Sequence, residues 1–247
     1  MAKSGKPARR PGRPQSARPA RPGAAAAKRK QTPKKTPAVV FDRKETAPDE
    51  PRTFRLGAVP GATPGRWIDT WKQRMPRVTL ELSTLTVSDQ ESALREGLLD
   101  AAIIRLPINR DGLHVISLYD EVPVVVAAVD SHLMATDELD VSDLAGEVVL
   151  HSNEDVLGPL DLPGTVAASI APLLTTSDAI EAVAAGVGIA VVPMSLARLH
   201  HRKDVDFRPL RAGTESTVAL AWPVDGTSAD VDAFIGIVRG RTANSSR

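Results

Sequence analysis

The sequence has no cysteine and very few aromatic residues. Phe, Trp and Tyr make up only 3% of the 247 residues. The absence of cysteine excludes a disulfide scaffold, a thiolate zinc site, an iron–sulfur cluster and a cysteine nucleophile. Because 42% of the residues are hydrophobic, a sizeable core is still expected, built mainly from Val, Leu, Ile and Ala.

Long hydrophobic runs are also missing. No stretch approaches the roughly 18 apolar residues of a transmembrane helix. The basic start of the sequence is followed only by the short alanine run 24–27, which is too short for the apolar region of a signal peptide. We therefore expect a cytoplasmic protein with no membrane partner, either free or associated with the nucleoid.

Acidic residues are absent from the first 37 positions, which hold 12 basic residues. The remaining 19 basic residues face 30 acidic ones, so a segment of charge +12 precedes a body of charge −11. This asymmetry suggests an arm that contacts nucleic acid. Its many prolines and few large apolar residues predict disorder, and we expect residues 38–52 to form a linker.

A disordered arm can neutralise phosphates, but it has no folded recognition helix with which to read bases. We therefore expect any contact with DNA to be nonspecific, the alternative being a tail that only increases solubility. The candidate DNA contacts are the basic residues Arg9, Arg10, Arg13, Arg18, Arg21, Lys28, Arg29, Lys30, Lys34 and Lys35.

The first half of the body alternates strands and helices. Short apolar segments predict strands at 54–59, 78–84 and 100–106. Between them, Thr63 followed by Pro64 predicts a helix start, and residues 88–91 form a capping-box pattern before a second helix. A β-α-β-α-β order of this kind predicts a parallel sheet covered by helices.

The second half continues the alternation. Further strands are predicted at 113–118, 122–129, 147–150, 188–193, 207–210 and 217–222, with a less certain one at 165–170. Helices are predicted from a cap at 175–178 to a stop at Gly186, over 195–200 and over 228–239.

Three stretches together resemble the effector-binding domain of LysR-type transcriptional regulators. They are FRLGAVPG with the segment that follows it, DGLHVISLYDEVPVVVAAVDSHLMA, and AAGVGIAVVP within the predicted helix–strand unit. The resemblance covers about residues 53–239. It implies an α/β, two-lobed fold like that of type-two periplasmic binding proteins, with lobe one at 53–121 plus 219–247 and lobe two at 122–218.

The resemblance also implies a small-molecule effector in the cleft between the lobes, a role in transcription regulation and a homodimer. Residues 1–52 are too short, too basic and too proline-rich for the winged helix-turn-helix that family members carry. We therefore expect the sensing part without the usual DNA reader.

The candidate effector contacts lie where the fold would place the cleft. Backbone N–H groups at the start of the first helix favour an anion such as a carboxylate. Members of the family often have a hydroxyl residue in this turn and another before the second helix. Here these positions align with Pro60–Gly61 and with Val87, which weakens the case for a carboxylate. Thr63 and Ser88 could instead be plain helix caps, and Arg105 could form an ion pair. The full candidate set is Gly61, Ala62, Thr63, Thr86, Ser88, Arg105, Ser152, Asn153, Thr176, Pro193 and Met194.

The sequence gives no positive sign of catalysis. The five histidines lack metal-ligand spacing, and no nucleophile elbow, Walker loop or dinucleotide fingerprint occurs. We expect no catalytic residue, no metal and no cofactor. Two other hypotheses stay open: an accessory or nucleoid-associated DNA-binding protein that uses the body for dimerisation, and a solute receptor or enzyme on the same fold.

Overall fold

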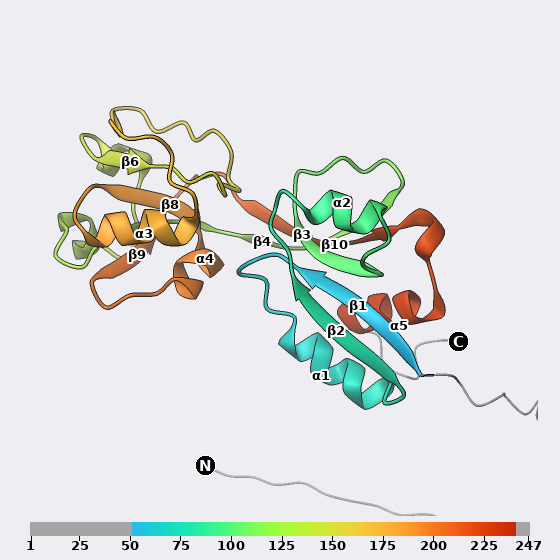
Figure 1. Ribbon diagram of the computed structural model, residues 1–247. Helices are drawn as coiled ribbons and strands as arrows, with labels where there is room; N and C mark the ends of the chain where they lie inside the picture. Colours follow the sequence, from blue (N-terminus) through green and yellow to red (C-terminus); the bar gives the residue numbers. More distant parts are fainter. Residues whose placement is uncertain (1–50, 241–247) are drawn as a thin grey trace, which may run out of the picture. The chain divides into compact units, whose positions relative to one another are not determined.

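Two five-stranded sheets organise the computed structural model (Figure 1). The structure describes residues 51–240, all of which belong to one compact unit. The predictions of a disordered tail and of DNA contacts between Arg9 and Lys35 lie outside the described residues. No helix within the described part is long and apolar enough to cross a membrane.

The first sheet has the strand order β2-β1-β3-β10-β4. Strand β1 runs parallel to both β2 and β3, as the β-α-β-α-β pattern predicts, whereas β10 pairs antiparallel with β3 and β4. The elements of this half are β1 (Arg52–Ala58), α1 (Gly65–Arg74), β2 (Val78–Thr84), α2 (Gln90–Arg95), β3 (Ala101–Arg105), β4 (Leu113–Glu121), β10 (Ser216–Pro223), the 3₁₀ helix η3 (Val224–Gly226) and α5 (Ala229–Val238).

The scarce aromatic residues are concentrated on one face of this sheet. Phe54 stacks on Trp71 with ring centroids 4.7 Å apart, and it lies 5.2 Å from the ring of Phe234. All three side chains are buried, so they fasten α1 and α5 to β1. The opposite face is covered by a second apolar cluster that includes Leu94 of α2 and Ile104 of β3.

The second sheet has the strand order β7-β6-β8-β5-β9. Strand β8 runs parallel to β6 and antiparallel to β5. The elements of this half are β5 (Pro123–Ala128), the 3₁₀ helices η1 (His132–Ala135) and η2 (Val141–Leu144), β6 (Val148–Leu150), β7 (Val166–Ala167), α3 (Thr176–Ala184), β8 (Ile189–Pro193), α4 (Met194–Leu199) and β9 (Val205–Pro209).

The local helix signals were correct to different degrees. Thr175 caps α3 as expected, since its hydroxyl accepts a hydrogen bond from the Asp178 N–H at 3.1 Å. By contrast, Pro64 rather than Thr63 is the N-cap of α1, and Asp89 rather than Ser88 is the N-cap of α2. The predicted strand at 165–170 shrinks to β7, whose two residues are exposed and bury no apolar face.

The strand order reverses at one strand in each sheet. The chain leaves β1 to form β2 on one side and then β3 on the other, and β6 stands in the same relation to β7 and β8. Ligands of open α/β sheets bind at the carboxyl ends of strands at such switch points. The fold therefore directs attention to the residues that follow Ala58 and Leu150.

Candidate functional site

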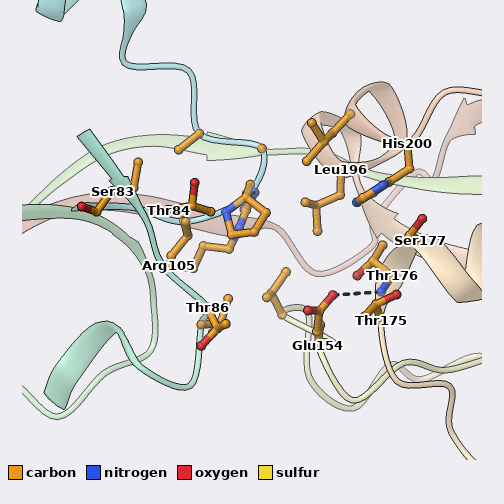
Figure 2. A pocket seen from close by; sticks show the side chains of 18 of the residues that line it. Ser83, Thr84, Thr86, Arg105, Glu154, Thr175, Thr176, Ser177, Leu196 and His200 are labelled. Carbon is orange, nitrogen blue, oxygen red and sulfur yellow. Dashed lines mark hydrogen bonds between the residues drawn. The ribbon is translucent and has the colours of Figure 1, made fainter. Parts of the chain in front are cut away.

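A cavity of about 450 Å³ lies beside the end of β1 and the loop that follows β6, with walls from both halves of the molecule (Figure 2). Figure 2 shows Thr86 and Arg105 on one side and Glu154, Thr176, Leu196 and His200 on the other. The lining combines a largely apolar surface with hydroxyl groups. The residues are Ala58, Val59, Pro60, Gly61, Ala62, Pro64, Leu82, Ser83, Thr84, Thr86, Val87, Arg105, Glu154, Val156, Thr175, Thr176, Ser177, Leu196, Leu199 and His200.

Arg105 ends β3 and is buried, with 1% of its surface exposed. Its Nη1 atom donates to Glu121 Oε2 and to Ser216 Oγ, both at 2.9 Å. Its Nη2 atom donates to Ser195 Oγ at 2.9 Å and to the Pro60 carbonyl at 3.4 Å. Ser195 in turn donates to Glu121 Oε2 at 2.8 Å, which closes the network.

This network joins the two halves of the molecule. Glu121 and Ser216 pair in register on β4 and β10, the strands next to the two segments through which the chain passes between the sheets. Ser195 belongs to α4 of the second half. Arg105 thus forms the ion pair that the sequence left open as its alternative role, and Glu121 balances its charge.

One polar atom of Arg105 has no partner. Among the described residues, Nε is the buried side-chain nitrogen or oxygen for which no hydrogen bond is present. The other donors of the guanidinium group are all used. Although Arg105 borders the cavity, its structural contacts account for its burial without a ligand.

Gly61 forms the turn beside this network. Its φ of +82° is a left-handed conformation that favours glycine, and a Cβ atom here would lie 3.1 Å from Arg105 Nη2 and strike Ser195 Oγ. Gly61 therefore allows the backbone after β1 to approach the buried guanidinium group closely.

Thr86 and Ser88 hold the start of α2 together. The Thr86 hydroxyl donates to Asp89 Oδ2 at 2.6 Å and accepts from the Asp89 N–H at 3.2 Å, and it lies 2.7 Å from Ser88 Oγ. These contacts fit a local structural role for both hydroxyl groups. Thr86 nevertheless lines the cavity, whereas Ser88 does not.

The amino-terminal end of α3 faces the cavity from the other side. The Thr176 N–H donates to Glu154 Oε2 at 2.9 Å, as the dashed line in Figure 2 shows. Glu154 lies in the loop after β6, and its side chain is exposed. Ser152 also approaches this helix end, with its Oγ 3.5 Å from Thr176 Oγ1. The helix terminus thus already holds a carboxylate that belongs to the protein.

The predicted site residues separate into three groups. Gly61, Ala62, Thr86, Arg105 and Thr176 line the main cavity. Ser88 and Asn153 line neither the main cavity nor the hollows beside it. The others line neighbouring hollows: Thr63 and Met194 a second cavity of about 600 Å³, and Ser152 and Pro193 a small one of about 10 Å³.

Several residues of the lining were not predicted from the sequence, above all Glu154. Ser152 and Asn153 were candidates because they follow β6 directly, but the loop turns so that Glu154 reaches α3. The acidic residue shortly after a strand was the available signal. Leu196, Leu199 and His200 were missed because α4 was treated only as a short helix.

The second cavity lies near the crossing strands and includes Tyr119, Asp120 and Glu121. Burial raises the pKa of the half-buried Tyr119 phenol, and the nearby Glu121 carboxylate adds to this shift. Among the described residues, no group of three or more His, Cys, Asp or Glu side chains is arranged to hold a metal ion.

Comparison with known proteins assigns the chain to a family. The LysR substrate binding domain matches this chain over residues 48–243. The chain belongs to the LysR substrate-binding domain family. The resemblance recognised in the sequence and the expected α/β fold with two sheets are thereby confirmed.

The relatives of this LysR-family chain are transcription regulators. The Hca operon transcriptional activator HcaR of Escherichia coli K12 is 27% identical over 212 residues, which are 79% of this chain and 70% of HcaR. The HTH-type transcriptional regulator MetR of the same organism is 29% identical over 131 residues, or 51% of this chain. That match spans only 41% of MetR.

Among solved structures, the BenM effector binding domain with its effector benzoate has the same fold. It superimposes with a TM-score of 0.64 at 22% identity, covering 76% of this chain and 91% of the BenM domain. At this identity the likeness concerns the fold alone.

Proposed function

We propose that this chain is a small-molecule sensor in LysR-type transcription regulation, with its effector bound in the 450 Å³ cavity. The observation that carries the proposal is that both halves of the molecule line this cavity, at the end of the switch-point strand β1 and in the loop that follows β6. A ligand in contact with both walls can favour one relative arrangement of the two halves over another.

The proposed moving parts are two lobes, at 53–121 plus 219–247 and at 122–218. The chain passes between the sheets at 121–123 and 209–216, which are the natural hinge segments. Buried contacts next to them, centred on Arg105, would fix the path of the crossing strands while the lobes close. We assign this chain no catalytic residue, and we place its action in the cytoplasm, where DNA is accessible.

The proposed effector contacts are those predicted residues that line the cavity: Gly61, Ala62, Thr86, Arg105 and Thr176. The backbone of Gly61 and Ala62 and the side chains of Thr86 and Thr176 are the parts offered to a ligand. For Arg105, a ligand would have to compete with Glu121 and Ser195 for the guanidinium group.

Ligand screening with a blocked variant tests the sensor proposal. Thr84 is exposed and lines the cavity, so a Thr84→Trp side chain should fill it. Thr79 is exposed on the same strand but does not line the cavity, so Thr79→Trp is the matched control. Compounds that raise the melting temperature of the wild type should do so in Thr79→Trp and fail in Thr84→Trp. Equal shifts in both variants would contradict the proposal.

We further propose that the chain acts as a homodimer and that its basic tail contacts DNA without sequence specificity. The charge of +12 over residues 1–37 supports the DNA contact. Fluorescence anisotropy of duplex DNA should show binding by the full chain that weakens steeply with salt and is lost in a chain beginning at Thr53. Light scattering on the same samples tests the dimer. Absence of DNA binding by both chains would refute the role of the tail.

A further inference from the structure

The electric charge of the cavity lining is unusual for an anion receptor. Its three titratable or charged side chains are Arg105, Glu154 and His200. Glu121 neutralises Arg105 through a buried ion pair of 2.9 Å. No ion pair joins Glu154 to a cation within the described residues 51–240. Glu154 is therefore the one carboxylate of this lining, and it forms no ion pair among the described residues.

The turn before α1, in the first wall, offers few backbone N–H donors to an anion. Two of its residues, Pro60 and Pro64, have no backbone N–H group. The Ala62 N–H already donates to the Val59 carbonyl at 3.2 Å. The turn at the start of α1 therefore lacks much of the donor array that makes a helix terminus attractive to a carboxylate.

Two N–H groups at the helix end of the second wall are already in use. The Thr176 N–H at the start of α3 donates to Glu154, and the Asp178 N–H donates to Thr175 Oγ1. The position that an anionic ligand would take at this helix end is held by the protein's own carboxylate. An incoming carboxylate would have to displace Glu154 or bind beside it, and like charges in one cavity disfavour binding.

We infer that this cavity selects an apolar molecule that carries a cationic or hydrogen-bond-donating group, and that Glu154 sets this preference. The inference rests on the proposed sensor function. The apolar body would contact Val87, Leu196 and Leu199, and the donor group would bind the Glu154 carboxylate. The sequence suggested an anionic effector, and the charges of the folded cavity favour the opposite sign.

Matched triples of probes that share one apolar body and differ in charge test this inference. Benzylamine, benzyl alcohol and benzoate form one triple, and the cyclohexylmethyl amine and alcohol with cyclohexanecarboxylate form another. Dissociation constants come from titrations of the full chain, followed by the amide NMR signals of Gly61 and Thr176. A pH of about 8 keeps the amines protonated and the carboxylates ionised.

We expect the wild type to bind amines more tightly than alcohols and carboxylates most weakly, with about tenfold between the amine and the carboxylate. Glu154→Gln should weaken amine binding about tenfold and tighten carboxylate binding. Glu154→Ala removes the hydrogen-bond acceptor as well as the charge, and it should change amine and carboxylate binding in the same directions. Because Gln keeps an acceptor, any further loss of amine binding in the Ala variant measures the hydrogen bond.

Asp155→Asn is the control, because Asp155 adjoins Glu154 but does not line the cavity. Its carboxylate accepts a bond from the Leu157 N–H that an Asn oxygen can also accept. This variant should keep the wild-type order. Carboxylates binding most tightly to the wild type, or Glu154→Gln leaving the order unchanged, would overturn the inference while leaving the sensor function intact. If no probe shifts either amide signal, the sensor function fails, and the inference with it.

Discussion

Arg105 and Glu154 border the same cavity, but the fold treats their charges in opposite ways. Arg105 is buried and gives its Nη donors to Glu121, Ser216, Ser195 and the Pro60 carbonyl. Glu154 is exposed and accepts one backbone N–H. A charged residue beside a cavity can therefore belong to the scaffold, and the charge without an ion-pair partner is the one available to a ligand.

Removing the buried cation should have the largest effect on stability. Arg105→Met leaves Glu121 buried without its partner, so the free energy of unfolding should fall by about 3–5 kcal/mol. Urea denaturation followed by circular dichroism measures this loss.

The double variant Arg105→Met/Glu121→Leu provides the control, because it removes both charges. It should recover much of the lost stability, since the uncompensated charge is the main cost. A single variant that loses less than about 1 kcal/mol would mean that the ion pair is not structurally important.

Gly61→Ala should disturb the hydrogen bonds of Arg105 through the backbone turn that contacts them. The residue has φ +82°, and its new Cβ atom would meet Ser195 and Arg105. We expect a loss of about 2–4 kcal/mol from combined backbone strain and overpacking.

Gly97→Ala separates the two causes. Gly97 also has a positive φ, of +68°, but nothing lies near its Cβ position. It should lose only about 1–2 kcal/mol, from the conformation alone. Equal losses in thermal unfolding of the two variants would show that the close approach to Arg105 contributes nothing.

Glu154→Gln should have a much smaller effect on stability. The carboxylate lies at the positive end of α3, where a negative charge contributes about 0.3–1 kcal/mol. Asp178, the capping-box partner of Thr175, accepts from the Thr175 N–H at 3.1 Å and does not line the cavity. Asp178→Asn, measured by the same urea denaturation, should cost at least as much. A loss of several kcal/mol in Glu154→Gln would place Glu154 with Arg105 as part of the scaffold.

The smallest effect concerns an ion pair remote from the cavity. The hydrogen bond from Arg208, 2.7 Å from Asp206, holds the pKa of Asp206 below its ordinary value. Its stabilisation is therefore complete above the unfolded pKa and is lost as the pH falls below about 4. Because the pair is only partly buried and solvent screens it, Asp206→Asn should flatten this acid loss by less than about 1 kcal/mol. A larger change in the pH profile of unfolding would contradict this estimate.

Local patterns were enough to predict most of the fold. The parallel arrangement of β1, β2 and β3 follows from apolar strands that alternate with helices. Thr175 is a strong cap because its hydroxyl accepts from the Asp178 N–H, while the Asp178 carboxylate accepts from the Thr175 N–H. The start of α1 shifted by one residue, since Thr63 makes no capping bond and Pro64 takes the cap position.

The cavity was predicted less completely, because its chemistry depends on contacts between distant segments. The sequence pointed to Arg105 at the end of a strand, but its partner Ser195 lies 90 residues away. Glu154 bonds Thr176, which lies 22 positions further along a mostly irregular part of the chain. No periodic pattern in the sequence indicates such a contact. Strand ends can be read from a sequence, whereas the neutralisation of a charge requires the folded structure.

In the proposed function, a small molecule binds between two walls, one from each half of the molecule. The most direct measurement is an amide NMR map of the full chain with the compound that raises its melting temperature most. We expect signal changes at Gly61 and Ala62 of the first wall together with Thr176 and Ser177 of the second. Changes confined to one wall, or located away from both, would contradict it.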